Sequence, residues 1–120
     1  ILTYPDRYDD VIRLLTKVEF EFAGKKEEFF AKLFRVLQIM RRFVGRSIGE
    51  ARKQIQRELG LTEYQARRYT DILWFNDMVR WTPVGFPPVY RIEILPKGLR
   101  VLERGYITKA DLPAYRGKYE

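Results

Sequence analysis

Tyr64, Gln65, Arg67 and Arg68 are the residues of this chain whose types and spacing best fit a defined chemistry. An arginine guanidinium can donate hydrogen bonds to the edge of a guanine, or it can hold a phosphate. The simpler interpretation of two adjacent arginines is a solvated helix face. Their position after a capped helix and a tight turn favours contact with DNA bases in a major groove.

The composition removes most other chemistry. The 120 residues contain no cysteine and no histidine, which excludes disulfides, thiol nucleophiles, histidine-dependent triads and most transition-metal sites. Ser47 is the only serine, and no local pair of carboxylates marks a catalytic cleft. We therefore expect no enzymatic activity, no metal and no cofactor.

Two capped helices are predicted to position the four residues. Ser47 with Glu50 has the spacing of a capping box, and Thr62 with Gln65 repeats it. Gly60, between them, can adopt the left-handed conformation that ends a helix. These signals predict one helix over about residues 48–59 and a second over about residues 63–77, joined by a tight turn as in a helix-turn-helix.

Each predicted helix has an apolar side and a polar side. The apolar side of the first helix carries Ile48, Ala51, Ile55 and Leu59. Its outward side carries Arg52, Lys53, Gln56 and Arg57. The inward side of the second helix carries Ala66, Tyr69, Thr70 and Leu73. Its outward side is predicted to carry Tyr64, Arg67, Arg68, Asp71 and Phe75.

The charge of the chain is distributed unevenly. The net charge is +7 and the isoelectric point is about 9.8, which favours an anionic partner. Residues 1–40 contain seven basic and seven acidic side chains, residues 41–80 nine and five, and residues 81–120 seven and four. The positive excess therefore begins at the helix pair, as expected for a nucleic-acid-binding surface.

The elements that follow complete a familiar order. Residues 78–82 predict a strand, residues 83–88 a turn and residues 90–94 a returning strand whose Tyr90, Ile92 and Ile94 alternate inward. Residues 96–105 predict a helix with Leu99, Leu102 and Val101 toward the core. Helix, helix-turn-helix, hairpin and helix in this order resemble a winged-helix DNA-binding domain of the kind common in archaeal and bacterial transcriptional regulators. The likeness covers roughly residues 25–105, and the expected fold class is mainly α with a small antiparallel β hairpin.

The resemblance implies a sequence-specific double-stranded DNA-binding protein, a dimeric transcriptional regulator that reads the major groove with residues 62–77. The expected base-reading residues are Tyr64, Gln65, Arg67 and Arg68. The expected phosphate-binding residues are Arg52, Lys53 and Arg57, the N–H groups of Ile48 and Gly49, and the strand residues Arg80 and Arg91. Arg41, Arg42 and Arg46 either offset a helix dipole or contact phosphates.

The predicted hairpin tip, residues 83–88, contains no lysine or arginine. Phe86 could enter a minor groove, pack on Phe75 or dock on a protein partner, and local packing is the preferred interpretation. The uncharged tip keeps a second function open. In that alternative, the chain is a winged-helix protein-interaction module of a larger transcription, replication or division assembly.

The ends of the chain are expected to support this domain. Residues 1–24 predict a short helix and a strand that pack on the core or on a dimer partner, and residues 106–120 predict an extended surface tail. Between them, a long helix over about residues 26–44 carries a wide apolar surface, which favours a homodimer.

No run of about 18 apolar residues and no signal-peptide pattern is present, so a cytoplasmic location is expected. One asparagine, two methionines, no cysteine and abundant arginine and glutamate resemble the residue usage of a heat-adapted protein.

Overall fold

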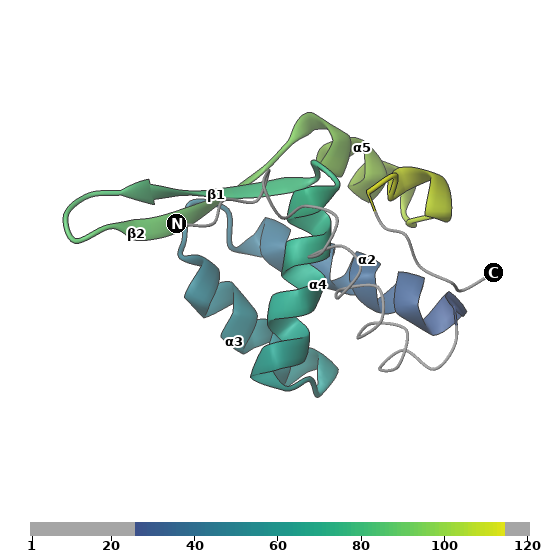
Figure 1. Ribbon diagram of the computed structural model, residues 1–120, viewed down its shortest axis with the longest axis horizontal. Helices are drawn as coiled ribbons and strands as arrows, with labels where there is room; N and C mark the ends of the chain where they lie inside the picture. The colour runs from purple at the N-terminus through teal and green to yellow at the C-terminus, as the bar shows by residue number, and fades with distance from the viewer. Residues whose placement is uncertain (1–25, 115–120) are drawn as a thin grey trace.

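The computed structural model describes residues 26–114, so the expectations for residues 1–24 and for the last six residues lie outside the described part. The elements, in chain order, are α2 (Lys26–Arg42), α3 (Ile48–Leu59), α4 (Glu63–Phe75), β1 (Val79–Val84), β2 (Val89–Ile94), α5 (Pro96–Arg104) and the 3₁₀ turn η2 (Lys109–Asp111). The expected fold class, mainly α with one antiparallel hairpin, is confirmed (Figure 1). No described helix is long and apolar enough to cross a membrane.

Both predicted capping boxes are present. At the start of α3, the Glu50 N–H donates to Ser47 Oγ at 3.1 Å, and at the start of α4 the Gln65 N–H donates to Thr62 Oγ1 at 3.1 Å. Gly60 adopts φ 66°, in the left-handed region, and ends α3 as expected. Local sequence signals therefore fix the turn between α3 and α4.

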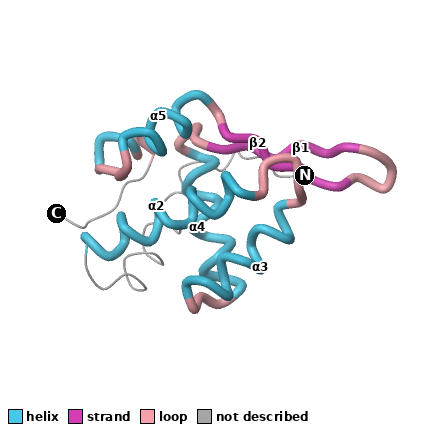
Figure 2. Tube along the Cα trace, turned by 180° about the vertical axis from the view of Figure 1, so that it is seen from behind, coloured by secondary structure: helices cyan, strands magenta, loops and turns pink. Residues whose placement is uncertain are grey.

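The core is built around α2. Six of its apolar side chains are almost completely buried: Phe29, Leu33, Val36, Leu37, Ile39 and Met40. Helices α3, α4 and α5 all pack against it. Figure 2, which views the molecule from behind, shows α2 between α5 and α3. The helix ends at Arg42, two residues before the predicted end, because the chain then turns toward the hairpin.

The base of the hairpin is fixed to the N-terminus of α3. Strands β1 and β2 are antiparallel, with Val79 opposite Ile94 and Val84 opposite Val89. Ile92 in β2 also accepts from the Gly45 N–H and donates to the carbonyl of Arg46, both at 2.9 Å. From this base the hairpin projects away from the helices (Figure 1).

The projection explains one correction in β2. Ile92 is buried as predicted, but Tyr90, which the alternation placed inward, is exposed. Alternation predicts which residues share a face of a strand, but a face is buried only where another element covers it. Beyond its base, the hairpin leaves the helices, so Tyr90 remains in solvent.

The C-terminal segment corrects two further expectations. In α5, Val101 is buried, whereas Leu99, expected to face the core, is 45% exposed. Residues 106–114 are not simply an extended surface tail, because Ile107 and Leu112 are buried in the core. The Ala114 N–H donates to the side-chain oxygen of Asn76 at 2.9 Å, which fixes this segment against the end of α4.

Helix α5 also needs a glycine where it crosses the start of β1. A Cβ atom placed on Gly98 would lie 2.2 Å from the carbonyl oxygen of Met78 and 2.9 Å from a methyl carbon of Ile94. Two of the close atoms belong to the Met78 backbone, which cannot move aside as a flexible side chain could. Gly98 therefore allows α5 to pack directly on the backbone next to the hairpin.

Candidate nucleic-acid interface

A charged cluster lies between α3 and α4. Arg52 of α3 donates to Thr70 Oγ1 at 3.0 Å and to Asp71 Oδ1 at 3.3 Å. Arg68 of α4 forms an ion pair with the other oxygen of the same carboxylate, at 3.6 Å. The side chains of Arg52, Asp71 and Arg68 are only 17%, 12% and 20% exposed. We call these three residues the Asp71 cluster.

Aromatic rings complete the Asp71 cluster. The Arg52 guanidinium lies 5.1 Å from the centre of the Trp81 ring, and the Arg68 guanidinium lies 4.4 Å from that of Tyr64. Trp81 of β1 also packs on Trp74 of α4, with ring centres 4.5 Å apart. Cation–π contacts of this kind strengthen as the cation loses water, so the hairpin and α4 together hold both arginines in place.

These contacts correct the predicted outward faces of both helices. Arg52 and Arg68 are largely buried, and Asp71 and Phe75 of α4 are buried, although helical spacing placed all four outward. The predicted spacing within each helix is correct. What it could not include is Trp81 of β1, which packs on Trp74 of α4 and on the Arg52 guanidinium.

The electrostatics of Asp71 reflect its position. Burial raises the pKa of Asp71 above its ordinary value, and the positive charges of Arg52, Arg68 and Arg67 only partly oppose this effect. Losing water disfavours the charged form of a carboxyl group, whereas a nearby cation favours it. Two arginines in direct contact therefore offset much of the charge of Asp71 without cancelling the cost of its burial.

The side chains that remain exposed on the helix pair form a smaller set than the sequence predicted. Arg67 on α4 and Lys53 and Arg57 on α3 are exposed, and Tyr64 is 41% exposed while it carries the Arg68 guanidinium on its ring. Arg57 donates to the Gln54 side chain within α3. Of the two adjacent arginines on α4, only Arg67 points to solvent.

Gln65 has a structural partner that the sequence already suggested. Its side-chain oxygen accepts from the Thr62 N–H at 2.9 Å and closes the capping box of α4. The prediction that Gln65 also approaches a base therefore competes with its place in the cap. The spacing of Thr62 and Gln65 is the sequence signal for this role, because a closed capping box occupies the side-chain oxygen of the third residue.

The predicted phosphate sites at the N-terminus of α3 lie beside an acidic side chain. Ile48 is buried and Gly49 is exposed, and the carboxylate of Glu50 accepts from the Ser47 N–H and pairs with Arg46 at 2.8 Å. The hydrogen bond from Arg46 is the largest of several contacts that lower the pKa of Glu50. A phosphate bound at this terminus would therefore lie beside a carboxylate.

The remaining predicted residues lie at the hairpin base or on α2. Arg80 is exposed opposite Glu93, and Arg91 is exposed while it donates to the carbonyl of Gly45 at 2.6 Å. Arg42 forms an ion pair with Glu58, which crosses from α2 to α3. These contacts brace neighbouring elements, so Arg42 and Arg91 have structural partners whatever else they bind.

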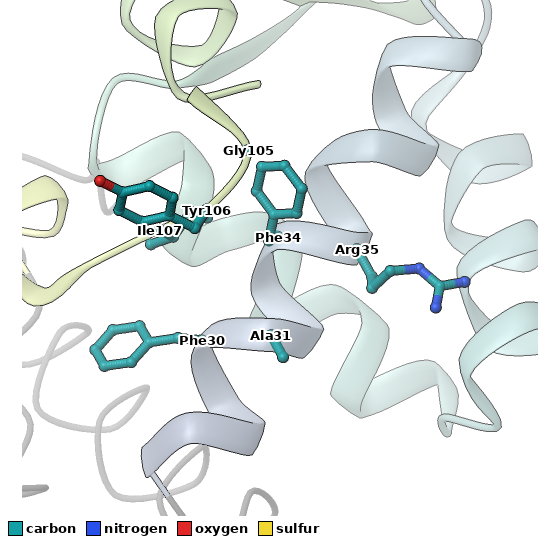
Figure 3. A pocket seen from close by; sticks show the side chains of 7 residues that line it. All are labelled: Phe30, Ala31, Phe34, Arg35, Gly105, Tyr106 and Ile107. Carbon is teal, nitrogen blue, oxygen red and sulfur yellow. The ribbon is translucent and has the colours of Figure 1, made fainter. Parts of the chain in front are cut away.

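A hollow lies on a different part of the surface. A groove of about 500 Å³ between α2 and the segment after α5 is lined by Phe30, Ala31, Phe34, Arg35, Gly105, Tyr106 and Ile107. Figure 3 shows the rings of Phe30, Phe34 and Tyr106 around it. Within residues 26–114, no group of three or more acidic side chains is placed to hold a metal ion.

Comparison of the chain with models of protein families, with curated proteins and with solved structures found no match.

Proposed function

We propose that the protein is a winged helix-turn-helix protein that binds double-stranded DNA in a sequence-specific manner and acts as a dimeric transcriptional regulator. The observation that carries the proposal is the tight pair of α3 and α4, on which Arg67 and Lys53 remain exposed beside a hairpin fixed to the start of α3. In this arrangement the N-terminal half of α4 enters the major groove, which is wide enough to admit a helix.

The contacts of the Asp71 cluster and of the helix cap leave fewer residues for base contact than the sequence predicted. Arg67 is the exposed cation on α4, and Tyr64 is the exposed ring next to it. Arg68 lies over Tyr64 and pairs with Asp71, and Gln65 closes the cap. We therefore assign base contact to Arg67 and Tyr64, and we assign Arg68 and Gln65 the task of holding α4 and its tyrosine in position.

Phosphate contact falls to the exposed cations of α3 and of the hairpin. Lys53 and Arg57 lie on the solvent side of α3, and Arg80 lies near the base of the hairpin. Such contacts supply affinity with little dependence on sequence and weaken as salt concentration rises, because binding releases counterions from the DNA. Base contacts from α4 add the preference for one sequence over another.

A selection of duplexes from a randomised pool, followed by binding titrations at several salt concentrations, tests the proposal. Arg67→Ala is expected to relax the preference at one base position by about 1–3 kcal/mol, and Lys53→Ala to weaken binding to all sequences and reduce the salt slope by about 1. Arg100→Ala, which removes one exposed charge from α5, serves as the control and should change neither. Equal losses on every sequence for Arg67→Ala and Lys53→Ala would overturn this division of roles.

The alternative, a protein-interaction module of a larger assembly, is favoured by one observation. Phe86 at the hairpin tip is 99% exposed and no charged side chain lies in the turn around it. Binding to arbitrary duplex distinguishes the two functions, because a DNA-binding protein of this charge should lose affinity steeply with salt and an interaction module should show little binding at any salt.

The dimer remains part of the proposal. The groove beside α2 exposes apolar surface that a second copy of the chain could cover, and two copies would present two α4 helices to successive turns of a duplex. Analytical ultracentrifugation of the chain with and without duplex measures the oligomeric state. A protein that stays monomeric in both conditions would contradict this part of the proposal alone.

A further inference from the structure

The tip of the hairpin is an apolar surface that the fold itself does not use. Phe86 lies in the turn between β1 and β2 with its ring entirely in solvent, so the expectation of local packing is wrong. Phe75, the suggested packing partner, is buried in the core instead. Val84, Val89 and Tyr90 beside the turn are also exposed. Contiguous exposed apolar side chains on a projecting element mark a contact site.

The charge of the hairpin indicates the kind of partner. Residues 80–92 contain Arg80 and Arg91 and no acidic side chain. Both arginines are exposed and lie toward the base of the hairpin, whereas the tip is uncharged. A polyanion that approaches the outer part of the hairpin, residues 81–91, therefore meets no carboxylate, because Glu93 lies at the base opposite Arg80. This arrangement favours an anionic partner over a basic or neutral one, and under the proposed DNA-binding function that partner is the duplex.

The reach of the hairpin matches the spacing of DNA grooves. Each strand has six residues, so the tip lies roughly 20 Å beyond the base at about 3.3 Å per residue. Successive turns of a duplex repeat every ~34 Å, which places a minor groove about half that distance from the neighbouring major groove. With the base of the hairpin beside a major groove, a tip at this reach would lie at the adjacent minor groove.

The turn itself is suited to insertion. Pro83, Pro87 and Pro88 restrict the backbone around Phe86, so little conformational freedom is left to lose on contact. Gly85, with φ 83°, allows the chain to reverse immediately before the ring. Apolar side chains presented in this way can enter between base pairs from the minor groove, unstack one step and bend the duplex.

We propose that Phe86 is a wedge that inserts between base pairs in the minor groove and bends the DNA. This inference rests on the proposed DNA-binding function and extends it, because the wedge adds affinity and bending that α4 does not supply. Bases stack on an aromatic ring whatever their identity. The wedge would therefore favour flexible pyrimidine–purine steps and not a particular base pair.

The test uses the full chain and a 30-base-pair duplex containing TA steps, with a donor and an acceptor dye at its ends and 2-aminopurine at one TA step. At 50 mM salt, the unaltered protein is expected to raise both energy transfer and 2-aminopurine fluorescence. Phe86→Ala should bind about ten-fold more weakly and produce neither signal. Phe86→Trp, which keeps a large ring, should produce both signals, and Arg67→Ala should bend the duplex once it is saturated.

Each outcome decides the question. If the unaltered protein and Phe86→Ala bind equally and neither bends the duplex, the wedge is rejected while DNA binding stands, and a protein-docking role for the tip becomes the better explanation. If the unaltered protein does not bind the duplex at all, both proposals fail. Because Phe86 is 99% exposed, the melting temperature of Phe86→Ala should equal that of the unaltered chain.

Discussion

On helices α3 and α4, each largely buried arginine has an exposed cationic side chain next to it in the sequence. Arg52 and Arg68 are largely buried around Asp71, whereas Lys53 and Arg67 are exposed. One residue along a helix corresponds to a rotation of about 100°, which is enough to move a side chain from the Asp71 cluster into solvent. The role of each cation is therefore decided by the carboxylate within its reach and not by its residue type.

The largest expected effect is the loss of stability on removing Asp71, the carboxylate between the two buried arginines. Asp71→Ala leaves Arg52 and Arg68 without their shared acceptor in a largely dehydrated site, and we expect a loss of about 3 kcal/mol in the free energy of unfolding. Urea denaturation measures it. Glu103→Ala, which removes an exposed acid from α5, should change stability by no more than about 0.5 kcal/mol. Similar values for the two variants would show that the Asp71 cluster does not stabilise the fold.

The next prediction separates the adjacent arginines. Arg68→Ala removes an ion pair and the contact with the Tyr64 ring, and should cost about 1 kcal/mol of stability. Arg67→Ala, at an exposed position, should leave the melting temperature unchanged. Thermal unfolding of the two variants side by side provides the measurement. An Arg67 variant that is less stable than the Arg68 variant would reverse the assignment of buried and exposed roles.

A smaller effect is expected at Gln65. Gln65→Ala opens the capping box of α4 and should cost about 0.5 kcal/mol of stability, while Gln65→Glu keeps an acceptor for the Thr62 N–H and should retain it. Neither variant should alter base preference in the duplex selection. A changed preference for Gln65→Ala, with unchanged stability, would return this residue to the base-reading set.

The smallest expected effect is on how the free energy of unfolding depends on pH. Burial raises the pKa of Asp71 in the folded protein, so, as pH falls, the folded chain binds a proton at Asp71 before the unfolded chain does. Between the raised folded pKa and the unfolded value near 3.8, this proton uptake favours the folded state as pH decreases. Asp71→Asn lacks it.

The free energy of unfolding of Asp71→Asn should therefore fall more steeply with decreasing pH in that interval than the value for the unaltered chain. Urea titrations across the interval measure the two curves. The carboxyl group of Asp111 provides an internal contrast. Burial tends to raise its pKa, but hydrogen bonds from Arg104 and Thr108 outweigh that and lower it. Parallel curves for Asp71→Asn and the unaltered chain would contradict the raised pKa of Asp71.

The parts of the fold that the sequence predicted are those set by nearby residues. The starts of both helices and the turn between them were predicted from Ser47 with Glu50, Thr62 with Gln65, and Gly60. This prediction was possible because a capping box depends on residues only three positions apart. The order of helices and the hairpin followed from the same kind of local pattern. Helix ends were less accurate, since α2 and α4 both stop two residues early.

The errors arose where distant segments meet. Periodicity placed Arg52, Asp71 and Phe75 outward, because it could not include the packing between elements that buries them, as where Trp81 of β1 packs on Arg52. It also placed Leu99 inward. Of the base-reading candidates, Arg67 is exposed as the helical pattern indicated, but the ion pair of Arg68 depends on how α3 and α4 pack, which a single helix pattern does not contain.

The hydrogen bonds that join Ile92 to residues 45 and 46 make the hairpin and the start of α3 a single stiff body. A stiff body presents its two ends at a fixed separation before any partner arrives. Association with a duplex should then cost the protein little ordering entropy, and the deformation would fall on the nucleic acid. Under the proposed DNA-binding function, a duplex would then be selected by how readily it bends to this fixed separation.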